Sequence, residues 1–503
     1  MISATNKATQ AVELLDNADG LRRAVSIRTC PKHKAHLGQF MTPANVASFM
    51  AKLFPKSTIR KCRLLDAGAG LGALSCAFLH RWAIGGFPFA GVEVTAYEID
   101  PAIRSYLTKA LAQYTAQLPV TTRVIEGDFI EIVTGNDIPK KGNFTHAILN
   151  PPYKKINSDS AHRHALRSVG IETVNLYSAF VALALSLMAP GGQLVAIIPR
   201  SFCNGPYYKP FRDFILARAA IRHIHLFDSR NKAFMDDAVL QENVIILLER
   251  SKKQGPVSIS TSTDDSFSDL ATRTHEFASI VFADDPERFI HVPTSAALSP
   301  FETSSAIRLT LEDLKIKVST GPVVDFRMSK HLREMPEPGS VPLLYPVHFS
   351  GSHTKWPQPD IRKPNAIVLN SETERWLYPN GFYCVVRRFS SKEERRRIVA
   401  SVIDPACFPE AVMLGIENHL NVFHDGRKGL PEALARGLAA FLNTTPVDEH
   451  FRRFSGHTQV NATDLKLMKY PSRSALNVLG KWASQHPQPT QVELDQQLEY
   501  IIK

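Results

Sequence analysis

Short apolar runs alternate with amphipathic segments between Arg63 and Arg250, a pattern that predicts a parallel sheet covered by helices. Seven runs are expected to be strands, at residues 63–68, 92–100, 122–129, 145–150, 192–199, 221–228 and 242–249. Segments such as GALSCAFLHRWA and NLYSAFVALALSLMA between them are expected to be helices. The connection between the last two strands is too short for a helical crossover, so these strands should pair antiparallel at one sheet edge. The pattern therefore predicts an α/β fold with a doubly wound, Rossmann-like sheet of seven strands.

The composition and the hydrophobic pattern of the chain change after about Lys253. The stretch SKKQGPVSISTSTDDSFSD is polar and rich in turn residues, and beyond it proline is frequent and the alternation fades. We expect an N-terminal arm at 1–36, the α/β domain at 37–252 and a second domain of mixed α+β structure at 253–503. The uncharged stretch Thr173–Pro199 is long enough to cross a bilayer, but MAPGG interrupts it. We interpret it as a buried helix, a turn and a buried strand.

Composition and charge limit the partners and the cellular compartment that the protein can have. The 503 residues include 59 Lys and Arg against 48 Asp and Glu, and the net charge of +11 favours a polyanionic partner such as nucleic acid. The six cysteines are scattered and never form a C-x-x-C pair, so neither a disulfide framework nor a zinc ribbon is indicated. The opening residues have no apolar core of the signal-peptide type, and we expect a cytoplasmic protein.

A glycine loop, LLDAGAGLGALS, lies directly after the first predicted strand and before a helix. Gly68, Gly70 and Gly72 would let the backbone turn sharply and approach a ligand, while the helix N-terminus presents free N–H groups. The same letters satisfy the relaxed dinucleotide fingerprint, so an NAD or FAD site is an open alternative at this point.

Two further strands end in acidic residues. Glu98 in AYEID is placed to accept ribose hydroxyls, and Asp128 in EGDFIE to accept an exocyclic amine, with Phe129 beside it as a stacking surface. Either carboxylate alone is equally well explained as the cap of the following helix. Three successive strand ends directed at one cleft favour a ligand site.

The fourth predicted strand ends in the letters NPPY, Asn150 to Tyr153. The side-chain carbonyl of Asn150 and a backbone carbonyl fixed by Pro151 and Pro152 are uncharged acceptors that suit an NH2 group. Tyr153 supplies a flat face for a planar ring. Two hydrogen bonds from such an amine would raise the electron density on its nitrogen for in-line attack on a sulfonium methyl group. An isolated Asn-Pro is otherwise a common turn opener.

The order of these motifs resembles that of the gamma-class adenine-N6 DNA methyltransferases of type II restriction-modification systems. HLGQFMTP (36–43) precedes the glycine loop, and LLDAGAGLG, YEID, GDF, NPPY and the NLYSAF helix follow in the order of that family. The segment HFRRFSGHTQVNATDLKLMKYP (450–471) is similar to a C-terminal signature of the PstI and BsuBI type of modification methylase. The resemblance is strong over 36–250 and weak over 260–440.

The resemblance implies S-adenosylmethionine as cofactor, no metal, and a role for each matching residue. Thr42 and Pro43 would line the methionine end of the cofactor, Asp66, Gly68 and Gly70 the glycine loop, Glu98 its ribose, and Asp128 and Phe129 its adenine. Asn150, Pro151, Pro152 and Tyr153 would hold the target adenine, rotated out of the duplex. Phe234 would pack on the other face of that base; its alternative role is ordinary hydrophobic packing within a β-hairpin. The long spacer before Glu98 departs from the family pattern and puts that assignment in doubt.

Basic clusters are the candidate DNA contacts. They comprise Lys154, Lys155 and Arg163 with His162, His164 and Arg167 after NPPY, Arg387 and Arg388 in RRFSSKEERRR, and Arg452 and Arg453. For the second cluster, which contains Glu393 and Glu394, a solvated helix face is an equal alternative. Cys30, His33 and His36 have no complementary second pair nearby, so we interpret them as surface residues and not as metal ligands.

These observations predict a site-specific DNA adenine-N6 methyltransferase of the prokaryotic cytoplasm, associated with the nucleoid. Residues 253–503 would recognise the DNA target, and a separate restriction endonuclease would be its functional partner. Two alternatives stay open: a methyltransferase acting on protein glutamine or RNA, because NPPY chemistry also suits other amine and amide nitrogens, and a nucleotide- or nucleic-acid-binding module without turnover.

Overall fold

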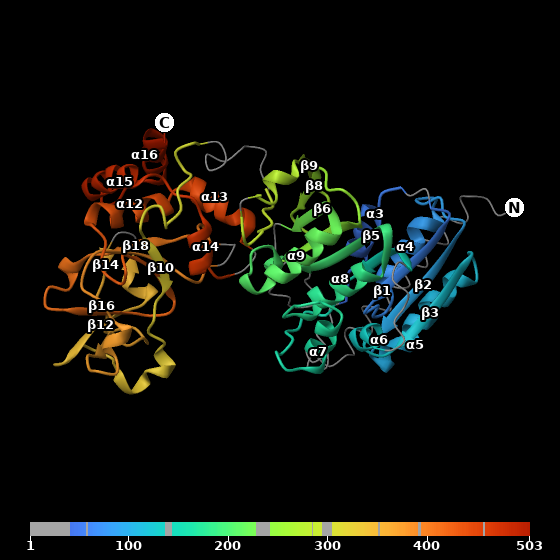
Figure 1. Cartoon of the computed structure of the whole chain (residues 1–503), viewed down its shortest axis with the longest axis horizontal. Helices are drawn as coiled ribbons and strands as arrows, with labels where there is room; N and C mark the ends of the chain where they lie inside the picture. The colour runs from blue at the N-terminus through green and yellow to red at the C-terminus, as the bar shows by residue number, and fades with distance from the viewer. Residues whose placement is uncertain are drawn as a thin grey trace. The chain divides into compact units, whose positions relative to one another are not determined.

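The chain folds into two compact units, Met1–Thr294 and Ser295–Lys503. The computed structural model describes residues 41–56, 59–135, 143–227, 242–283, 285–293, 304–350, 353–390, 394–455 and 458–502. Figure 1 shows the sheet-and-helix arrangement of the first unit and the mixed structure of the second.

A nine-stranded sheet forms the frame of the first unit, in the order β3-β2-β1-β4-β5-β7-β6-β8-β9. The strands are β1 (Lys61–Ala67), β2 (Gly91–Glu98), β3 (Val120–Glu126), β4 (Phe144–Leu149), β5 (Met188–Pro199), β6 (Ala219–Phe227), β7 (Asn243–Arg250), β8 (Val257–Ser262) and β9 (Ala271–His275). Strands β1 to β5 are parallel, and β7 is antiparallel to both of its neighbours, β5 and β6. The chain therefore winds outwards in both directions from the adjacent pair β1 and β4, which is the place where open α/β sheets bind ligands.

The seven strands predicted from the apolar runs correspond to β1–β7, and β6 and β7 pair antiparallel as expected. They are not at the sheet edge, because β8 pairs in parallel with β6 and β9 follows it. These two strands lie in the stretch that the sequence analysis assigned to a linker, so the first unit extends past residue 252 to Thr294. Ser260 and Ser262 of β8 are buried in spite of their polarity: Ser260 Oγ lies 2.7 Å from His223 Nε2 and 2.8 Å from His225 Nδ1.

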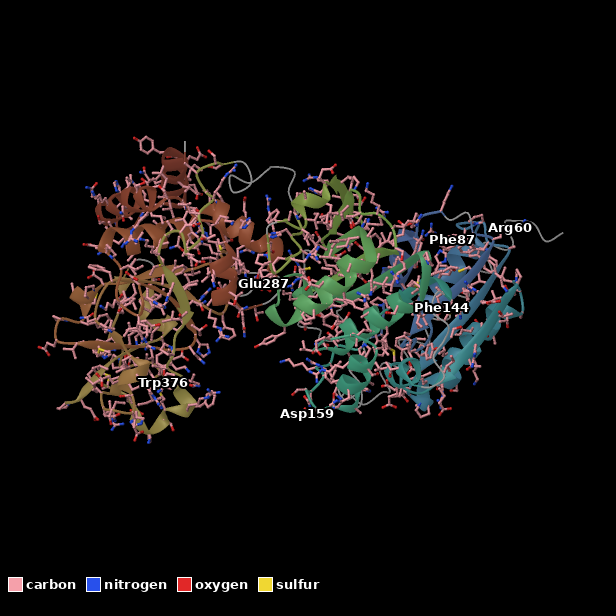
Figure 2. All side chains as sticks on the ribbon, viewed as in Figure 1. Arg60, Phe87, Phe144, Asp159, Glu287 and Trp376 are labelled. Atoms are coloured by element: carbon pink, nitrogen blue, oxygen red, sulfur yellow. The ribbon has the colours of Figure 1, made fainter. Side chains whose placement is uncertain are left out.

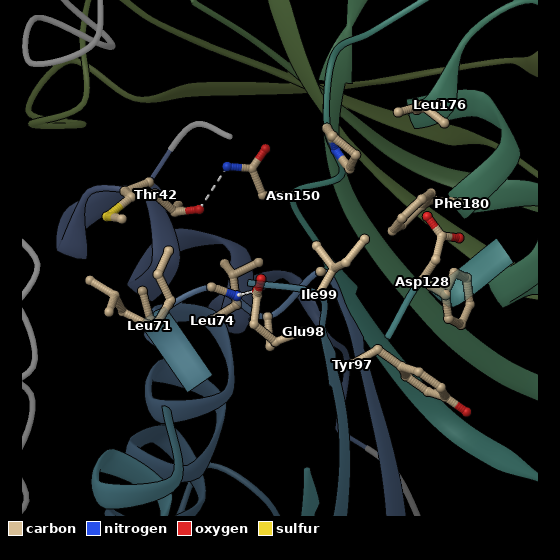
Figure 3. A pocket seen from close by; sticks show the side chains of 18 of the residues that line it. Thr42, Leu71, Leu74, Tyr97, Glu98, Ile99, Asp128, Asn150, Leu176 and Phe180 are labelled. Carbon is tan, nitrogen blue, oxygen red and sulfur yellow. Dashed lines mark hydrogen bonds between the residues drawn. The ribbon is translucent and has the colours of Figure 1, made fainter. Parts of the chain in front are cut away.

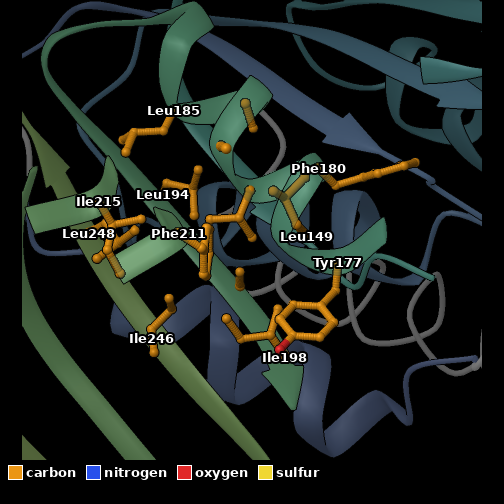
Figure 4. Packing of buried hydrophobic residues seen from close by; sticks show 14 of the residues in the cluster. Leu149, Tyr177, Phe180, Leu185, Leu194, Ile198, Phe211, Ile215, Ile246 and Leu248 are labelled. Atoms are coloured by element: carbon orange, nitrogen blue, oxygen red, sulfur yellow. The ribbon is translucent and has the colours of Figure 1, made fainter. Parts of the chain in front are cut away.

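Helices cover both faces of this sheet. Over one face lie α3 (Ala44–Leu53), α4 (Ala73–Ala83) and α5 (Pro101–Thr115); over the other lie α6 (Phe129–Thr134), α7 (Ala161–Ser168), α8 (Leu176–Leu187) and α9 (Lys209–Arg218). Alternate residues of each strand enter the two cores, as the pleat requires. Leu149 and Leu194 pack with Leu185 of α8 and Ile215 of α9 (Figure 4). Phe87 and Phe144, labelled in Figure 2, belong to opposite cores.

The uncharged stretch at 173–199 forms α8 followed directly by β5, both largely buried, which confirms the expected buried helix and buried strand. The turn expected at MAPGG is not formed, because these residues begin β5. Across the described ranges of the chain, no helix is both long and apolar enough to cross a membrane.

The second unit combines small sheets with a helical layer. Four antiparallel strands run in the order β10 (Lys317–Thr320), β20 (Leu420–His424), β17 (Tyr383–Arg387) and β18 (Ala400–Ile403). Five shorter strands run in the order β11 (Leu332–Arg333), β15 (Ala366–Val368), β12 (Ser340–Leu344), β19 (Met413–Ile416) and β16 (Tyr378–Pro379), and β13 (Phe349–Ser350) pairs with β14 (His353–Thr354). The expected mixture of helix and strand is present here.

Five helices of this unit are α12 (Glu432–Leu442), α13 (Thr445–Phe454), α14 (Ala462–Leu467), α15 (Arg473–Gln485) and α16 (Gln491–Ile502). Two glycines set the distance between α12 and α15. A Cβ on Gly437 would lie 1.9 Å from Leu476 O, and one on Gly480 would lie 1.7 Å from Ala433 O. Only hydrogen atoms fit between these backbones, so the close crossing depends on both glycines.

We predict that Gly480→Ala destabilises the second unit by at least about 2 kcal/mol, because the added methyl group forces the two helices apart. In a helix without this contact, the same change would stabilise the helix by up to about 1 kcal/mol. The sign of the change in unfolding free energy therefore shows whether the close crossing is present. Urea unfolding followed by circular dichroism measures it. Val478→Ala, at a half-exposed position of the same helix, is the control and should change the unfolding free energy by less than about 0.5 kcal/mol.

Candidate functional site

A cavity of about 310 Å³ lies where the carboxyl ends of β1, β2, β3 and β4 meet (Figure 3). It brings together most of the residues that the sequence analysis assigned to a cofactor and to the reacting group. Its lining includes Thr42, Gly68, Gly70, Glu98, Asp128, Phe129, Asn150, Pro152 and Lys154. Four separate strand ends converge here because β1 and β4 are neighbours in the sheet.

The glycine loop wraps the end of β1 around the carboxylate of Glu98. Gly68 and Gly70 have φ values of +76° and +56°, which residues with a side chain rarely adopt. This conformation directs the N–H of Gly70 at Glu98 Oε2, at 2.7 Å. The loop is therefore tied to the end of β2 by a charge-assisted hydrogen bond.

Glu98 is buried, and its other oxygen, Oε1, accepts from the N–H of Asp100 at 2.8 Å. Burial raises the pKa of Glu98, while the N–H groups of Asp100 and Gly70 oppose that rise. The next residue, Ile99, leaves 46% of its surface exposed and lines the cavity. A carboxylate beside an exposed apolar surface suits a ligand that carries both hydroxyls and a planar ring.

Asp128 begins α6 and accepts from the N–H groups of Ile130 and Glu131, at 2.7 and 3.1 Å. Its other oxygen lies 3.1 Å from His162 Nε2 of α7. Burial raises the pKa of Asp128, but His162 and the backbone donors outweigh it, so the pKa lies below the ordinary value. The hydrogen bond to Asp128 raises the pKa of His162 in spite of its partial burial.

The amide of Asn150 is held at both ends. Its Nδ2 donates to Thr42 Oγ1 at 2.9 Å (Figure 3). Its Oδ1 accepts from the hydroxyl of Tyr153 at 3.2 Å. The same hydroxyl lies 3.2 Å from the carbonyl oxygen of Ile197. Burial raises the pKa of Tyr153 well above its ordinary value, so the hydroxyl keeps its proton. The NPPY segment is thus anchored to β5 and to the residues before α3.

Asp66 takes a different place from the one expected of a cofactor ligand. It is fully buried behind the glycine loop, does not line the cavity, and accepts from Ser75 Oγ at 2.6 Å. Burial raises its pKa to about 7. Pro43 also lies outside the lining: it caps α3, and its carbonyl oxygen accepts from the N–H of Ala47 at 2.9 Å.

Aromatic and apolar side chains close the cavity on the α8 side. Phe129 is nearly fully buried and contacts the rings of Tyr97 and Phe180, at centroid distances of 4.9 and 5.1 Å. Sequence reasoning gave no site role to Ile99, Tyr97 or Phe180, and it placed His162 among the phosphate contacts. The apolar residue Ile99 directly after the strand-end carboxylate of Glu98 is a signal that the sequence offers, whereas the approach of α7 to Asp128 is not visible in the sequence.

The cationic residues after NPPY divide into two groups. Lys154 and Lys155 are exposed, and Lys154 lines the cavity mouth. Arg163 is buried in α7 and forms an ion pair with Glu172, which also bonds Arg167 at 2.8 Å. Arg163 therefore ties α7 to the following loop.

The arginines of the second unit are engaged within the protein. Arg387 pairs with Glu394, Arg388 donates to the carbonyl of Asn418 at 3.2 Å, and Arg452 pairs with Asp448 at 2.7 Å. Arg453 is buried. The described residues of the cluster at 387–397 form no helix, so the solvated helix face expected as the alternative is not what the structure shows there.

Phe234, the predicted second stacking surface, lies outside the described residues. Cys30, His33 and His36, which we interpret as surface residues, also lie outside them. In the ranges that the structure describes, no group of three or more His, Cys, Asp or Glu side chains is arranged to hold a metal ion.

Comparison with known proteins agrees with this geometry. The family model described as Eco57I restriction-modification methylase matches residues 106–234. The type II methyltransferase M.BsuBI of Bacillus subtilis is 49% identical over 502 residues, which is 98% of each chain. M.PstI of Providencia stuartii is 39% identical over 486 residues, 94% of each chain. The solved structure of the type IIL restriction-modification enzyme MmeI in complex with DNA has a TM-score of 0.50 and 11% identity, covering 98% of this chain and 74% of that one, which shows a likeness of fold.

The α/β fold, the cavity at its switch point and these relatives identify a DNA methyltransferase of a restriction-modification system. Within that class the chain belongs to the family of type II methyltransferases that includes M.BsuBI and M.PstI.

The pair of Asp128 and His162 leads to a pH prediction. Because the pKa of His162 is raised above its ordinary value, the pair stabilises the fold fully below about pH 6.5, and the stabilisation is lost as the pH rises through the folded-state pKa. We predict that the NMR titration midpoint of the His162 ring lies above about 6.5 and falls in Asp128→Asn. Glu131→Gln, at 3.9 Å from the ring, should lower it less. A midpoint unchanged by Asp128→Asn would contradict this assignment.

Proposed function

We propose that the protein is a site-specific DNA adenine-N6 methyltransferase that uses S-adenosylmethionine and protects host DNA from a cognate restriction endonuclease. The observation that carries this proposal is the position of Asn150. Its amide lies at the mouth of a cavity built from the glycine loop, Glu98 and Asp128, so a cofactor in the cavity and an amine held by Asn150 would be neighbours.

The residues of the cavity fit S-adenosylmethionine. Each oxygen of Glu98 accepts one backbone N–H and retains a lone pair for a ribose hydroxyl. Ile99 and Phe180 offer apolar surface for an adenine ring, and Asp128 an acceptor for its amine. Asp66 would act indirectly, by holding α4 and the glycine loop through Ser75. When bound, the cofactor supplies a methyl group activated by the sulfonium.

The chain's own contribution to the reaction is positioning and electrostatics. The carbonyl of Asn150 and the backbone carbonyl of Pro151 would accept the two protons of the N6 amine, which draws the nitrogen lone pair out of the ring and towards the methyl carbon. The N–C bond then forms as the S–C bond breaks, and one N6 proton is lost to water. Tyr153 would stack on the base, which must first be rotated out of the duplex, and Phe234 is proposed to close its other face.

The second unit, together with residues 253–294, is proposed to recognise the DNA target, in a cytoplasmic protein that acts on the nucleoid. Arg387 and Arg452 form ion pairs with acidic residues of the same unit, so much of their charge is already neutralised there. Lys154 and Lys155 are the cationic side chains best placed to contact phosphates beside the reacting base.

A transfer assay tests the proposed function. The protein is incubated with cofactor carrying a labelled methyl group and unmethylated duplex DNA, and the product is digested to nucleosides. We expect label in N6-methyladenine, and Asn150→Ala should lower the rate by at least about 1,000-fold with cofactor affinity retained, because both the acceptor and its geometry are lost. Asn157→Ala, in the exposed part of the same loop, is the matched control and should keep full activity.

Label in RNA or protein, with none in duplex adenine, would overturn the DNA assignment. An Asn150→Ala variant as active as the unchanged protein would overturn the mechanism instead.

The exposed lysines lead to a prediction about salt dependence. Each phosphate contact contributes about one unit to the slope of log K against log salt concentration. We expect Lys155→Ala to reduce that slope by about 1 and to weaken binding equally on specific and non-specific duplexes, as measured by fluorescence anisotropy between about 50 and 200 mM salt. Arg453→Ala should lower the unfolding free energy instead, because that side chain is buried. An unchanged slope in Lys155→Ala would remove this residue from the DNA contact.

A further inference from the structure

The nitrogen end of the Asn150 amide is held by a residue outside the NPPY motif. An asparagine side chain has nearly the same shape after a half-turn about its last bond, but that rotation exchanges an acceptor for a donor. Acceptance of an amine proton requires the oxygen to face the target. Within the motif, the Tyr153 hydroxyl bonds Oδ1, and the contact to Nδ2 comes from elsewhere in the chain.

Thr42 bonds the nitrogen end of the amide. Its Oγ1 accepts from Asn150 Nδ2 at 2.9 Å, while Oδ1 faces the Tyr153 hydroxyl at 3.2 Å. Thr42 is itself only 4% exposed, so water does not readily replace its oxygen. With Nδ2 bonded to the threonine, Oδ1 is the atom of the amide that can accept a proton from the target amine.

The threonine is held firmly by the helix that it precedes. Val46, Ala47 and Met50 of α3 are fully buried against the sheet. At the other end of α3, Arg81 donates to the carbonyl oxygen of Phe54 at 2.8 Å and also contacts that of Ala51. A side chain at the start of such a helix has little freedom to follow a moving partner, so it can hold the amide in one orientation.

We propose that Thr42 is a positioning residue for the methyl-transfer step, acting through Asn150. The inference rests on the proposed function of Asn150. It differs from the role that the resemblance implies, in which Thr42 lines the methionine end of the cofactor, because a positioning residue changes the turnover rate and a cofactor ligand changes cofactor affinity.

The test compares Thr42→Val, which keeps the shape and loses the oxygen, with Thr42→Ser, which keeps the oxygen. In Thr42→Val, kcat for methyl transfer to DNA should fall roughly 10- to 100-fold, because the amide of the half-buried Asn150 loses the hydrogen-bond partner that holds its nitrogen end. The cofactor KM should change by less than about twofold. Thr42→Ser should restore kcat to within about threefold. Thr108→Val, on the exposed surface of α5, is the matched control.

A second measurement does not depend on activity. In protein labelled with ¹⁵N-asparagine, exchange of the Asn150 side-chain N–H with solvent should be slow in the unchanged chain and in Thr42→Ser, and at least about tenfold faster in Thr42→Val. Asn150→Ala identifies the resonance. Should Thr42→Val not fold, Thr42→Ala is compared with Thr42→Ser in the same way.

An unchanged kcat in Thr42→Val, a loss confined to cofactor KM, or an unchanged exchange rate would each overturn the inference. Failure of the proposed function is separate: the unchanged chain would then put no label in duplex adenine, while the exchange experiment would still report on the contact between Thr42 and Asn150.

Discussion

The parallel pairing of β1 with β4 is the constraint on which the rest of the first unit depends. These strands are separated by two others in the chain but are neighbours in the sheet, so the connections leave them in opposite directions. The glycine loop and the NPPY segment follow them directly. No helix can cover the gap between two connections that diverge, and the cavity forms there.

Burial of charge at this place requires a specific partner for each carboxylate. Glu98 accepts backbone N–H groups of the loop and of the α5 start, and Asp128 accepts those of α6 together with His162. Asp66 has Ser75 alone, and its pKa is raised the furthest towards neutrality. The two carboxylates that line the cavity are therefore pre-ordered by the backbone, while the third supports the loop from behind.

The apolar runs and glycines predicted β1–β7 and the convergence of four strand ends, because period and turn chemistry are local properties. They did not predict β8, since Ser260 and Ser262 appear as solvent-exposed positions until His223 and His225 are placed opposite them. A run of basic residues likewise gave no sign that Arg163 would meet Glu172 inside the protein. Such pairings depend on partners that only the folded chain brings near.

The sequence by itself determined the class of chemistry: an uncharged acceptor on a proline-stiffened turn, and a glycine loop with acidic strand ends in the order of a known family. These are properties of short segments, and short segments keep them in any context. Tertiary structure alone decided that His162 belongs to the cavity, that Asp66 stands behind it, and that Thr42 orients Asn150. Each of these three contacts either joins residues 34 positions or more apart in the chain or depends on burial of a side chain. A buried polar group without a partner costs free energy, and this cost favours the folded arrangement in which each group has one.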